Sequence, residues 1–531
     1  MNSILSDRSK FKLHTSIDPL LNTLRCEDRL NRFLRKLKVC GAISQSTYEE
    51  IFISGSSPGT LYGLPKVHKT NIPLRPILSA YITPNYKLAK HLASLLNPLS
   101  TNIFTIKNSY EFANEITSLN SSHKIMYSFD VESLFTNIPL NEVIEIVINK
   151  IFQNSDTTFH NFTKIQFKQL LELAIKNMFF IFNKQLYEQI DGVAMGSPLA
   201  PVLANIFLSH HEENWLQQCP NNFKPLLYKR YVDDTFLLFE DTVDPNHFLN
   251  YLNSKHPNIR FTAESETNNQ ISFLDMSIHK QNNSFHTSVF RKKTFTGLGT
   301  NYFSSIPFRF KIASISTLVH RAYHLSSTYC NFHIEIKFLT KFFNDNFYPP
   351  LLLNKTVNKF LARIYQSNEN ATQTVPKQKI FIKLPYYGYI TDRITTDLKK
   401  LFTKHFPQLH INFICTNSLS IQSFFRHKER LPDSLCSSII YKFECLSCNA
   451  LYLGSTRRQF SCRVGEHRAV SIRTNRPLSA PPFSAVREHS QHTGHPIQHK
   501  NFKIVATTNN ADLHILESLY IKKLKPSPQS N

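Results

Sequence analysis

LLYKRYVDDTFLLF, residues Leu226–Phe239, has apolar, β-prone runs on both sides of two adjacent carboxylates, Asp233 and Asp234. Such runs on both sides of a short polar break predict a hairpin of buried strands with the acids at or beside the turn. Two like charges beside an apolar sheet are costly unless a cation compensates them. The segment therefore predicts either an exposed Asp-Asp turn, the commoner case, or a divalent-metal site for phosphoryl chemistry.

Length and composition describe a large, basic chain. Its 531 residues predict two or three domains, and a hydrophobic content of 41%, with 43 Phe and 21 Tyr, is enough to bury sizeable cores. Lys and Arg number 61 against 38 Asp and Glu, which gives a net charge of +23. A surplus of this size favours a polyanionic partner, with nucleic acid ahead of an anionic membrane.

Cysteine usage and apolar run lengths restrict the compartment. Nine Cys, an odd and mostly scattered set, favour a reducing environment over a disulfide framework. No uninterrupted apolar run of about 18 residues exists, so we expect no spanning helix and no membrane partner. The N-terminus, MNSILSDRSKFK, lacks the apolar stretch of a secretory signal.

The N-terminal part changes character after its first 50 residues. Residues 1–50 predict basic helices, and LYGLPKVHKTNIPLRPILSA (61–80) follows with three prolines that forbid a continuous helix. Its cations, Lys66 and Arg75 among them, therefore lie on short extended pieces. Taken alone, this cluster is equally consistent with ordinary surface charge.

A third carboxylate lies about a hundred residues before the Asp-Asp pair. Asp130 ends the strand-like run that opens IMYSFDVESLFTNIPL (125–140), and helical patterns follow at 141–153 and 163–180. GVAMGSPLAPVLANIFLSHHEE (192–213) begins as a Gly/Pro-rich loop, where a backbone can approach a ligand closely, and becomes an amphipathic helix.

The chain beyond the hairpin divides into several compositional segments. We expect a short strand at 271–280, a surface of mixed cations and aromatics suited to nucleic acid at 290–327, and helices to about 365. Further on we expect a linker at 367–379, a strand–helix–strand pattern over 379–416, a boundary at 426–434 and a separate unit rich in His, Cys and Arg.

Two strands of one sheet could bring Asp130, Asp233 and Asp234 together. Three such carboxylates would hold two metal ions about 3.5–4 Å apart, which activate a primer 3′-hydroxyl and stabilise the leaving pyrophosphate. Lys66 and Arg75 would hold the triphosphate, because cations stabilise the charge that develops in phosphoryl transfer.

The ordered motifs YGLPKVHK, LRPILS, FDVESLFTN, GVAMGSPLAPVLANIF, YVDD and FLD resemble the reverse transcriptase domain of Penelope-like retroelements, relatives of telomerase reverse transcriptases. The resemblance covers about 55–330. It implies an α+β, right-hand polymerase: N-terminal helices, fingers and palm over 1–290, then a helical thumb and connecting region over 291–430. The N-terminal part is short for a complete element of this kind.

The resemblance also assigns roles by position. Asp130 and Asp233 would be the principal ligands of two Mg²⁺ ions, with Asp234 as the third acid. Phe135 would exclude a ribose 2′-hydroxyl and so favour deoxynucleotides, although an ordinary core Phe is the alternative. The remaining pair, Gly196 and Ser197, would lie against the templating base and the incoming nucleotide.

Residues 431–531 resemble a small α/β GIY-YIG endonuclease domain, which many Penelope-like elements carry behind the polymerase. The residues that carry the resemblance are Tyr441, Tyr452, Arg463, His467 and Glu517. It implies one Mg²⁺ on the glutamate, a phosphate-neutralising arginine and water activated by a Tyr with the histidine. Ile439 stands where the motif has its first Gly, Leu453 stands for Ile, and Asn531 is the one candidate for the late Asn.

Cys445 and Cys448, a CxxC pair between the two tyrosine motifs, are spaced for a metal. Two Cys and two His suit a tetrahedral structural Zn²⁺, and a small unit has reason to use such a metal. The resemblance selects His489 and His495 as the histidine ligands. His492 or His499 could replace them, and a free CxxC beside surface histidines is the alternative.

Together these features predict an RNA-directed DNA polymerase of a Penelope-like retrotransposon coupled to an endonuclease that nicks target DNA to supply the primer 3′ end. Its partners would be an RNA template, a DNA target and primer, and dNTPs, and its place the nucleus by inference from the task. Two alternatives stay open: a catalytically silent nucleic-acid-binding protein derived from such an element, and a telomerase-like or intron-type reverse transcriptase with different priming.

Overall fold

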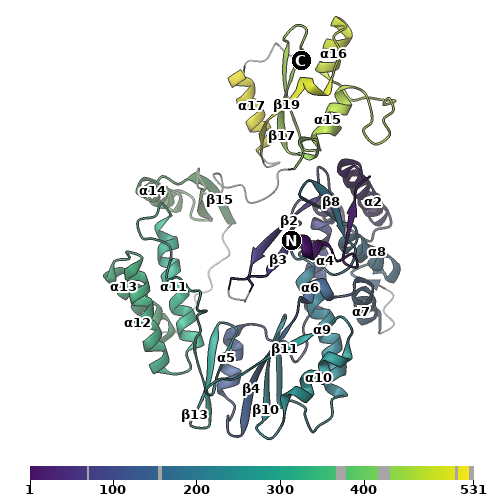
Figure 1. The fold of residues 1–531 in the computed structure, drawn as a ribbon. Coiled ribbons are helices and arrows are strands. Elements are labelled where there is room, and N and C mark those ends of the chain that lie inside the picture. Colours follow the sequence, from purple (N-terminus) through teal and green to yellow (C-terminus); the bar gives the residue numbers. More distant parts are fainter. Residues whose placement is uncertain (68–70, 154–157, 366–377, 417–430, 509–511, 525–531) are drawn as a thin grey trace.

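The computed structural model describes residues 1–67, 71–153, 158–365, 378–416, 431–508 and 512–524, and over this part the chain is α+β (Figure 1). The expected linker at 367–379, most of the boundary at 426–434 and the candidate Asn531 lie outside the described residues. Within the described ranges, no helix combines the length and apolar character that a bilayer crossing requires.

A four-stranded antiparallel sheet, here called the central sheet, contains the opening hairpin. Its strands run in the order β11 (Phe261–Ser265), β4 (Lys124–Val131), β10 (Asp234–Glu240) and β9 (Leu227–Tyr231). Val232, at φ +56°, makes the turn between β9 and β10. The hairpin predicted from the sequence is therefore confirmed, with the two acids at its turn.

Both faces of the central sheet are buried, which explains why TFLLF is apolar without alternation. Phe236 and Leu238 pack on one face with Met126, whereas Leu237 and Phe239 pack on the other. The second face is covered by helices α9 (Ala200–Gln217) and α10 (Pro245–Lys255), and helices α7 (Leu140–Phe152) and α8 (Lys164–Ile175) extend the same apolar core.

Two expectations about these helices need correction. The helix expected over 163–180 ends at Ile175, and strand β7 begins at Met178 after Asn177 adopts φ +58°. Helix α9 is buried around most of its circumference, so the amphipathic helix expected within 192–213 is instead a core helix. A helix enclosed on several sides has no reason to keep a polar face.

The first face of the central sheet packs against a three-stranded sheet and one helix. The elements are β12 (Gln270–Phe273), β13 (Met276–Gln281), β14 (Ser284–Val289) and α5 (Ser109–Thr117). The single strand expected at 271–280 is two strands, because Leu274 and Asp275 take left-handed φ values of +46° and +65° and form a turn.

A five-stranded sheet combines strands that precede β4 in the sequence with strands that follow it. Its order is β1 (Phe11–His14), β8 (Gln185–Gln189), β7 (Met178–Phe182), β2 (Gly59–Pro65) and β3 (Leu74–Ser79). The extended pieces expected in 61–80 are confirmed as the β2–β3 hairpin, which reaches out from this sheet (Figure 1). Strand β1 was not expected, since 1–50 was predicted to be helical.

Helices surround the five-stranded sheet, and small elements complete this half. The helices are α1 (Asn2–Leu5), α2 (Pro19–Val39), α3 (Gln45–Ile51), α4 (Tyr86–Leu96) and α6 (Leu134–Asn137). The small elements are the 3₁₀ turn η1 (Asn97–Leu99) and the strands β5 (Thr158–Phe159) and β6 (Phe162–Thr163).

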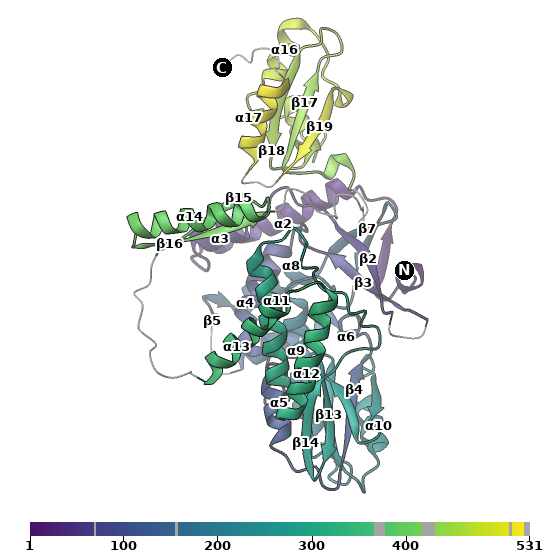
Figure 2. The same cartoon turned by 90° about the vertical axis from the view of Figure 1, so that its left-hand side faces the viewer.

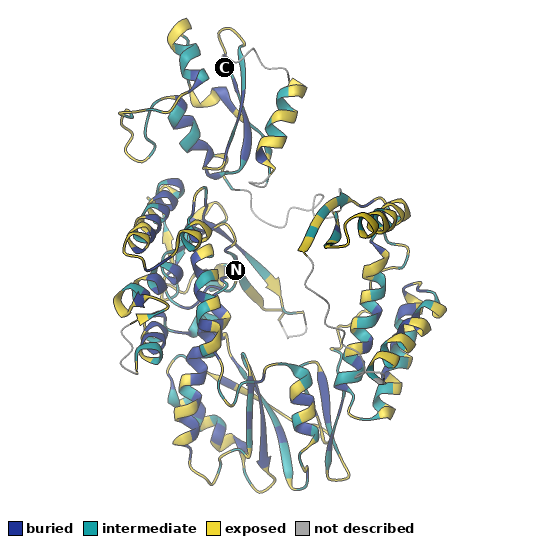
Figure 3. Cartoon of the chain, turned by 180° about the vertical axis from the view of Figure 1, so that it is seen from behind, coloured by how far each residue is buried: buried dark blue, intermediate teal, exposed yellow. Residues whose placement is uncertain are grey.

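Three helices stand across from the β2–β3 hairpin, and the first two contact strand β14 of the three-stranded sheet (Figure 1). They are α11 (Phe308–Leu325), α12 (Tyr329–Asp345) and α13 (Pro350–Tyr365), and they share their own apolar core. The expected strand–helix–strand follows as β15 (Gln378–Pro385), α14 (Tyr389–His405) and β16 (Leu409–Thr416), and its surface is largely exposed (Figure 3).

Residues 431–524, here called the C-terminal unit, form a second α+β unit with a sheet of its own. A three-stranded antiparallel sheet of order β18 (Leu451–Thr456), β17 (Ile439–Glu444) and β19 (Phe502–Thr507) is flanked by α15 (Phe460–His467), α16 (Ala485–Thr493) and α17 (Leu513–Leu524). Short 3₁₀ turns, η3 (Asp433–Leu435) and η4 (His499–Asn501), complete it. The unit stands next to α2 and the five-stranded sheet (Figure 2).

Candidate functional sites

Three carboxylates meet at one end of the central sheet. Antiparallel pairing of β10 with β4 places Asp234 directly opposite Asp130. Asp233 is one residue back in the turn, and its carbonyl oxygen accepts a hydrogen bond of 3.1 Å from the Val131 N–H. Because directly opposed residues have Cβ atoms about 5 Å apart on the same face, the register brings together the acids that the sequence singled out.

Burial and neighbouring negative charge raise the pKa values of Asp233 and Asp234. Limited hydration in this partly buried corner, together with the Asp233 and Asp130 charges, raises the pKa of Asp234 from 3.8 to about 6. Burial and the Asp130 charge likewise raise the pKa of Asp233. A divalent cation bound between such acids would stabilise their ionised form.

The predicted cations Lys66 and Arg75 face the same corner from the β2–β3 hairpin. Arg75 pairs with Leu64, and the backbone N–H of Lys66 continues the ladder to the Pro73 carbonyl at 2.9 Å. Both positive charges lower the pKa of Asp233, so they lie close enough to act on it. The structure thus joins two cations and three acids that the chain separates by 55 residues or more.

The Gly-rich loop before α9 packs closely against strand β3. Gly196 has φ +129°, and a Cβ there would lie 1.9 Å from the Leu78 carbonyl oxygen. The Leu78 N–H in turn donates to the Met195 carbonyl at 2.8 Å. Gly196 is therefore required for the loop to pass β3, and the neighbouring Ser197 is buried in the same passage.

Phe135 lies in α6, a single turn after β4. Its carbonyl oxygen accepts a 2.7 Å hydrogen bond from the Val193 N–H, which ties α6 to the Gly-rich loop. Its ring is half-buried and packs against the main core. The structure is compatible with both predictions for Phe135, as a core side chain and as a wall of the site.

A buried ion pair beneath the acidic turn was missed in the sequence. Arg230, in β9, is fully buried and pairs through Nε with Glu212 of α9, which is 1% exposed. The Glu212 carboxylate also accepts from the Tyr228 hydroxyl at 2.8 Å. The remaining Arg230 donors bind Ser209 Oγ at 3.1 Å and Asn205 Oδ1 at 3.0 Å.

This ion pair holds the hairpin turn. Arg230 Nη1 donates to the carbonyl of Val232 at 3.0 Å, and Val232 is the left-handed residue directly before the acids. A β-branched residue with positive φ is strained and persists when its surroundings fix it. We infer that Arg230 positions Asp233 and Asp234 through Val232, a role that LYKRY alone does not distinguish from surface charge.

In the C-terminal unit, three of the predicted side chains converge on Tyr441. Its hydroxyl lies 2.8 Å from His467 Nε2 and accepts a hydrogen bond of 3.0 Å from Arg463 Nε. Tyr452, on the neighbouring strand, packs its ring against those of Tyr441 and His467. Gly454 lies opposite Tyr441 in the β17–β18 pair, and a Cβ there would come within 2.7 Å of the Tyr441 hydroxyl.

His467 needs a correction. It is fully buried, its Nδ1 lies 2.6 Å from Ser484 Oγ, and its other nitrogen faces Tyr441, so no ring nitrogen is left for a water. Burial and the charges of Arg463 and Arg487 lower the pKa of His467 to about 3. The neutral ring therefore orients the Tyr441 hydroxyl and does not activate water itself.

Glu517, the remaining predicted nuclease residue, stands apart from Tyr441. Its carboxylate accepts a 2.8 Å hydrogen bond from Ser455 Oγ, and Ser455 points to the face of β18 opposite to that of Gly454. Glu517 and the Tyr441 cluster thus flank β18 from its two faces. Because β18 is an edge strand, groups on both of its faces lie beside the same unpaired edge of the sheet.

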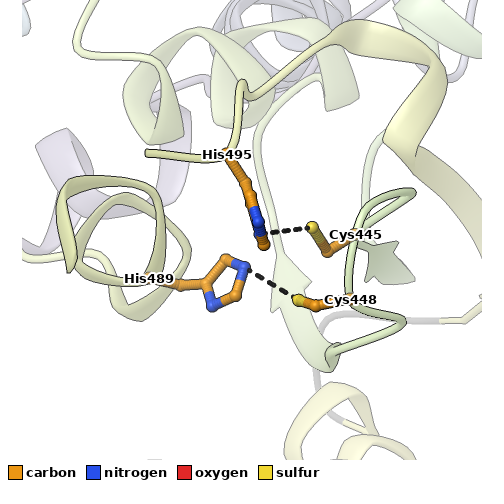
Figure 4. A group of neighbouring side chains, drawn as sticks. All are labelled: Cys445, Cys448, His489 and His495. Carbon is orange, nitrogen blue, oxygen red and sulfur yellow. Dashed lines mark hydrogen bonds between the residues drawn. The ribbon is translucent and has the colours of Figure 1, made fainter. Parts of the chain in front are cut away.

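The four predicted zinc ligands come together (Figure 4). Cys445 Sγ lies 3.4 Å from His495 Nδ1 and Cys448 Sγ lies 3.5 Å from His489 Nε2, with all four ligand atoms within 4.8 Å of one another. A tetrahedral ion with Zn–S bonds of about 2.3 Å and Zn–N bonds of about 2.1 Å separates S from N by roughly 3.6 Å. The donor set therefore fits a tetrahedral metal.

A second cluster, unexpected from the sequence, joins Glu142 to His211 and His256. One Glu142 carboxylate oxygen lies 3.0 Å from His211 Nε2, and the other lies 3.2 Å from His256 Nε2. The backbone N–H of Asn258 donates to His256 Nδ1 at 3.1 Å, so the proton of the neutral His256 ring sits on Nε2 and is donated to Glu142. That tautomer explains the cluster as hydrogen bonding without an ion.

Comparison with known families supports the polymerase half. Residues 67–271 match the family described as reverse transcriptase (RNA-dependent DNA polymerase), and Asp130, Asp233 and Asp234 lie inside the match. This part of the chain is therefore similar to a reverse transcriptase domain, which supports the prediction from the sequence. Residues 299–358, which span α11, α12 and the start of α13, match the animal helix-turn-helix domain, a likeness that was not expected.

Solved structures similar to this chain include polymerases. Telomerase from Candida albicans, bound to a TWJ fragment of telomeric RNA, is 12% identical, with a TM-score of 0.43 and 70% of each chain covered. Apo telomerase from Candida tropicalis, truncated from its C-terminal domain, is 13% identical at TM-score 0.33 and covers 44% of this chain. The Sicinivirus 3Dpol RNA-dependent RNA polymerase is 13% identical at TM-score 0.38, with 60% of this chain and 71% of that one covered.

These scores are too low to support an argument about function. The chain spans 56% of the length of that Candida tropicalis telomerase, a little over half. A search of the curated proteins found no match.

Proposed function

We propose that this protein is an RNA-directed DNA polymerase whose C-terminal unit nicks DNA and so supplies the primer end, as in Penelope-like retroelements. The observation that carries the proposal is the meeting of Asp130, Asp233 and Asp234 with two cations, inside a reverse transcriptase domain. The right-hand arrangement follows: the central sheet as palm, the β2–β3 hairpin in the fingers and α11–α13 as thumb.

The roles of the polymerase residues follow from their positions. The three carboxylates would hold Mg²⁺, which supplies the charge that activates the 3′-hydroxyl and stabilises pyrophosphate. Lys66 and Arg75 bind the triphosphate beside Asp233. The Phe135 ring packs near the sugar and excludes a 2′-hydroxyl, and the Gly196–Ser197 backbone lies along the nucleotide. RNA template, DNA primer and dNTPs are the partners, and the nucleus is the proposed compartment.

The raised pKa of Asp234, about 6 against 3.8 in an unfolded chain, predicts a pH-dependent response to Mg²⁺. Without metal, the native state holds this proton more tightly than the unfolded state, so stability falls as pH rises from about 4 through 6. Mg²⁺ requires the ionised form. We expect the Mg²⁺-induced rise in melting temperature to grow between pH 5 and pH 7, and Asp234→Asn to abolish most of that growth. An equal rise at both pH values would contradict this account.

We propose a GIY-YIG type of nuclease site along the edge of β18. Arg463 would neutralise the scissile phosphate, and the partly exposed Tyr452 would position the attacking water, while the fully buried Tyr441 would hold Arg463 in place through its hydroxyl. Glu517 would hold one Mg²⁺ from the other face of the strand, and His467 and Ser484 would keep the Tyr441 hydroxyl oriented. Ile439, in place of the motif glycine, is fully buried inside β17 and supports the same core, so its substitution leaves the cluster intact.

Glu517→Ala tests the nuclease site. We expect it to reduce nicking of supercoiled plasmid in Mg²⁺ by a factor on the order of 10² or more, because one metal-binding carboxylate is lost. Extension of a preannealed primer on RNA should be unchanged. Glu444→Ala is the matched control, since this partly exposed glutamate of β17 pairs with Lys442. Unreduced nicking by both Glu517→Ala and Arg463→Ala would refute the assignment.

The Cys–His cluster predicts one structural zinc per chain. We expect about one Zn²⁺ per molecule in atomic emission measurements on purified protein, and its loss in Cys445→Ser with a lowered melting temperature of the C-terminal unit. Cys330→Ser is the control, because Cys330 is an exposed thiol of α12. Zinc-free protein with wild-type stability would contradict the assignment.

Two other functions stay open as alternatives, each with a discriminating result. A catalytically silent binding protein derived from such an element would bind nucleic acid in a salt-sensitive way without turnover. A telomerase-like or intron-type polymerase would extend primers on RNA, with its own nicking activity absent or of a different kind. The presence of all three acids favours a catalytic protein over a catalytically silent binding protein.

A further inference from the structure

The C-terminal unit shares an apolar core with the polymerase half. Leu435, a fully buried residue of η3, packs with Leu20 and Leu24 of α2. The same cluster contains residues of β7 and β8 and partly buried side chains of the C-terminal unit, namely Ile181, Leu186, Leu431, Cys462 and Ile472. Contacts of this kind, between segments some 400 residues apart, form a packed interface between the two units.

The centre of this interface is polar, and hydrogen bonds cross it between the two units. Gln459 Nε2, on a side chain that is 1% exposed, donates to Glu27 Oε1 at 3.0 Å and to the Ser56 carbonyl at 2.9 Å. The Glu27 carboxylate also accepts from the Ser56 N–H at 2.6 Å. A buried carboxylate that loses such a donor is left unsatisfied, so the contact is specific as well as close.

The rim adds an ion pair and a close backbone approach. Arg473 donates to both Asp28 oxygens, at 2.6 Å and 2.8 Å. Ser437 Oγ donates to the Gly55 carbonyl at 2.6 Å. Gly55 has φ +75°, and a Cβ there would lie 2.1 Å from the Arg457 carbonyl oxygen, so this position admits glycine alone.

Helix α15 connects the interface to the Tyr441 cluster. Gln459 is the residue that precedes α15, and its carbonyl accepts from the Arg463 N–H at 3.3 Å. One face of the helix directs Cys462 into the shared core, while Arg463, the next residue, reaches Tyr441. Whatever fixes the start of α15 therefore also fixes the arginine.

We propose that this interface docks the C-terminal unit onto α2 and the loop before β2 as one rigid body, so that a nicked 3′ end is handed to the polymerase site within the same molecule. The inference rests on the proposed nuclease function for its purpose, but the docking itself stands on the contacts. Docking replaces a search by diffusion with a fixed geometry, which raises the yield of coupled reactions without altering either site.

Two glycines give a matched test of docking that needs no nuclease activity. Gly55→Ala and Gly41→Ala impose the same backbone strain, since both have φ +75°, but the Gly41 position has no atom within 4 Å of an added Cβ. In full-length protein we expect hydrogen exchange in peptides containing Ser56 and Cys462 to rise about tenfold in Gly55→Ala alone. Equal exchange in the two variants would overturn the docking.

A charge exchange tests the functional consequence. Asp28→Arg and Arg473→Asp should each lower the fraction of nicked plasmids that are extended by about threefold, and the double variant should restore it. Nicking alone and extension of a preannealed primer should stay unchanged throughout. Wild-type coupling in both single variants, or failure of the double variant to recover, would overturn the hand-over. Absent nicking in wild-type protein would refute the nuclease instead and leave the exchange result standing.

Discussion

Asp233→Ala should abolish RNA-templated DNA synthesis, with a loss in primer extension on the order of 10³-fold or more. Asp233 shares its end of the central sheet with Asp130 and Asp234, and its carboxylate lies within the field of Lys66 and Arg75. Removing it leaves two acids, too few to fix two cations beside the triphosphate. Steady-state extension of a DNA primer on an RNA template with dNTPs and Mg²⁺ measures the effect.

Asp241→Ala is the control for this prediction. Asp241 follows the other end of β10, is exposed and pairs with His123, so its loss should leave extension within about twofold of wild type. Binding of a primer–template duplex, measured by anisotropy, should be retained in both variants. Extension by Asp233→Ala at the wild-type rate would show that the acids are an ordinary turn.

Arg230→Met should cost about 3–5 kcal/mol of folding free energy, because it leaves the buried Glu212 carboxylate without its cation. The pair is enclosed at 0% and 1% side-chain exposure, so water cannot compensate. Urea unfolding followed by the fluorescence of Trp215, the one tryptophan of the chain, measures the loss. Arg260→Met, at an exposed arginine before β11 on the opposite edge of the central sheet, is the control and should cost little.

The double variant Arg230→Met with Glu212→Leu separates stability from positioning. Replacing both charges with apolar side chains should recover most of the folding free energy. Primer extension should stay reduced, because no donor then holds the Val232 carbonyl at the acidic turn. Full recovery of extension together with stability would show that Arg230 has a purely structural role.

Sequence reasoning succeeded where local patterns were strong. The run around Asp233 and Asp234 has apolar flanks that fit a two-sided buried hairpin, and the prolines of 61–80 could belong only to extended pieces. The carboxylates and the CxxC pair indicate their chemistry by residue type. Residue type and spacing alone are therefore enough to single out the three acids and the two cysteines, whereas His489 and His495 were selected through the resemblance.

The features that were missed depend on tertiary packing. Arg230 resembles a surface cation until α9 is placed beneath β9, and α9 was itself expected to be amphipathic because its neighbours could not be known. His467 was predicted to help activate water, because a sequence motif does not show that both ring nitrogens are buried. The Glu27–Gln459 contact joins residues 432 positions apart, a separation that no local pattern reports.

A nick-primed synthesis assay tests the central claim most directly. Full-length protein is incubated with supercoiled plasmid, an RNA template, labelled dNTPs and Mg²⁺, with no added primer. We predict labelled DNA covalently joined to the nicked plasmid strand, lost in Asp233→Ala while nicking persists, and lost together with nicking in Glu517→Ala. Labelled DNA found only in free molecules would contradict the account. Labelled DNA that is still joined to the plasmid strand in Asp233→Ala would contradict it as well.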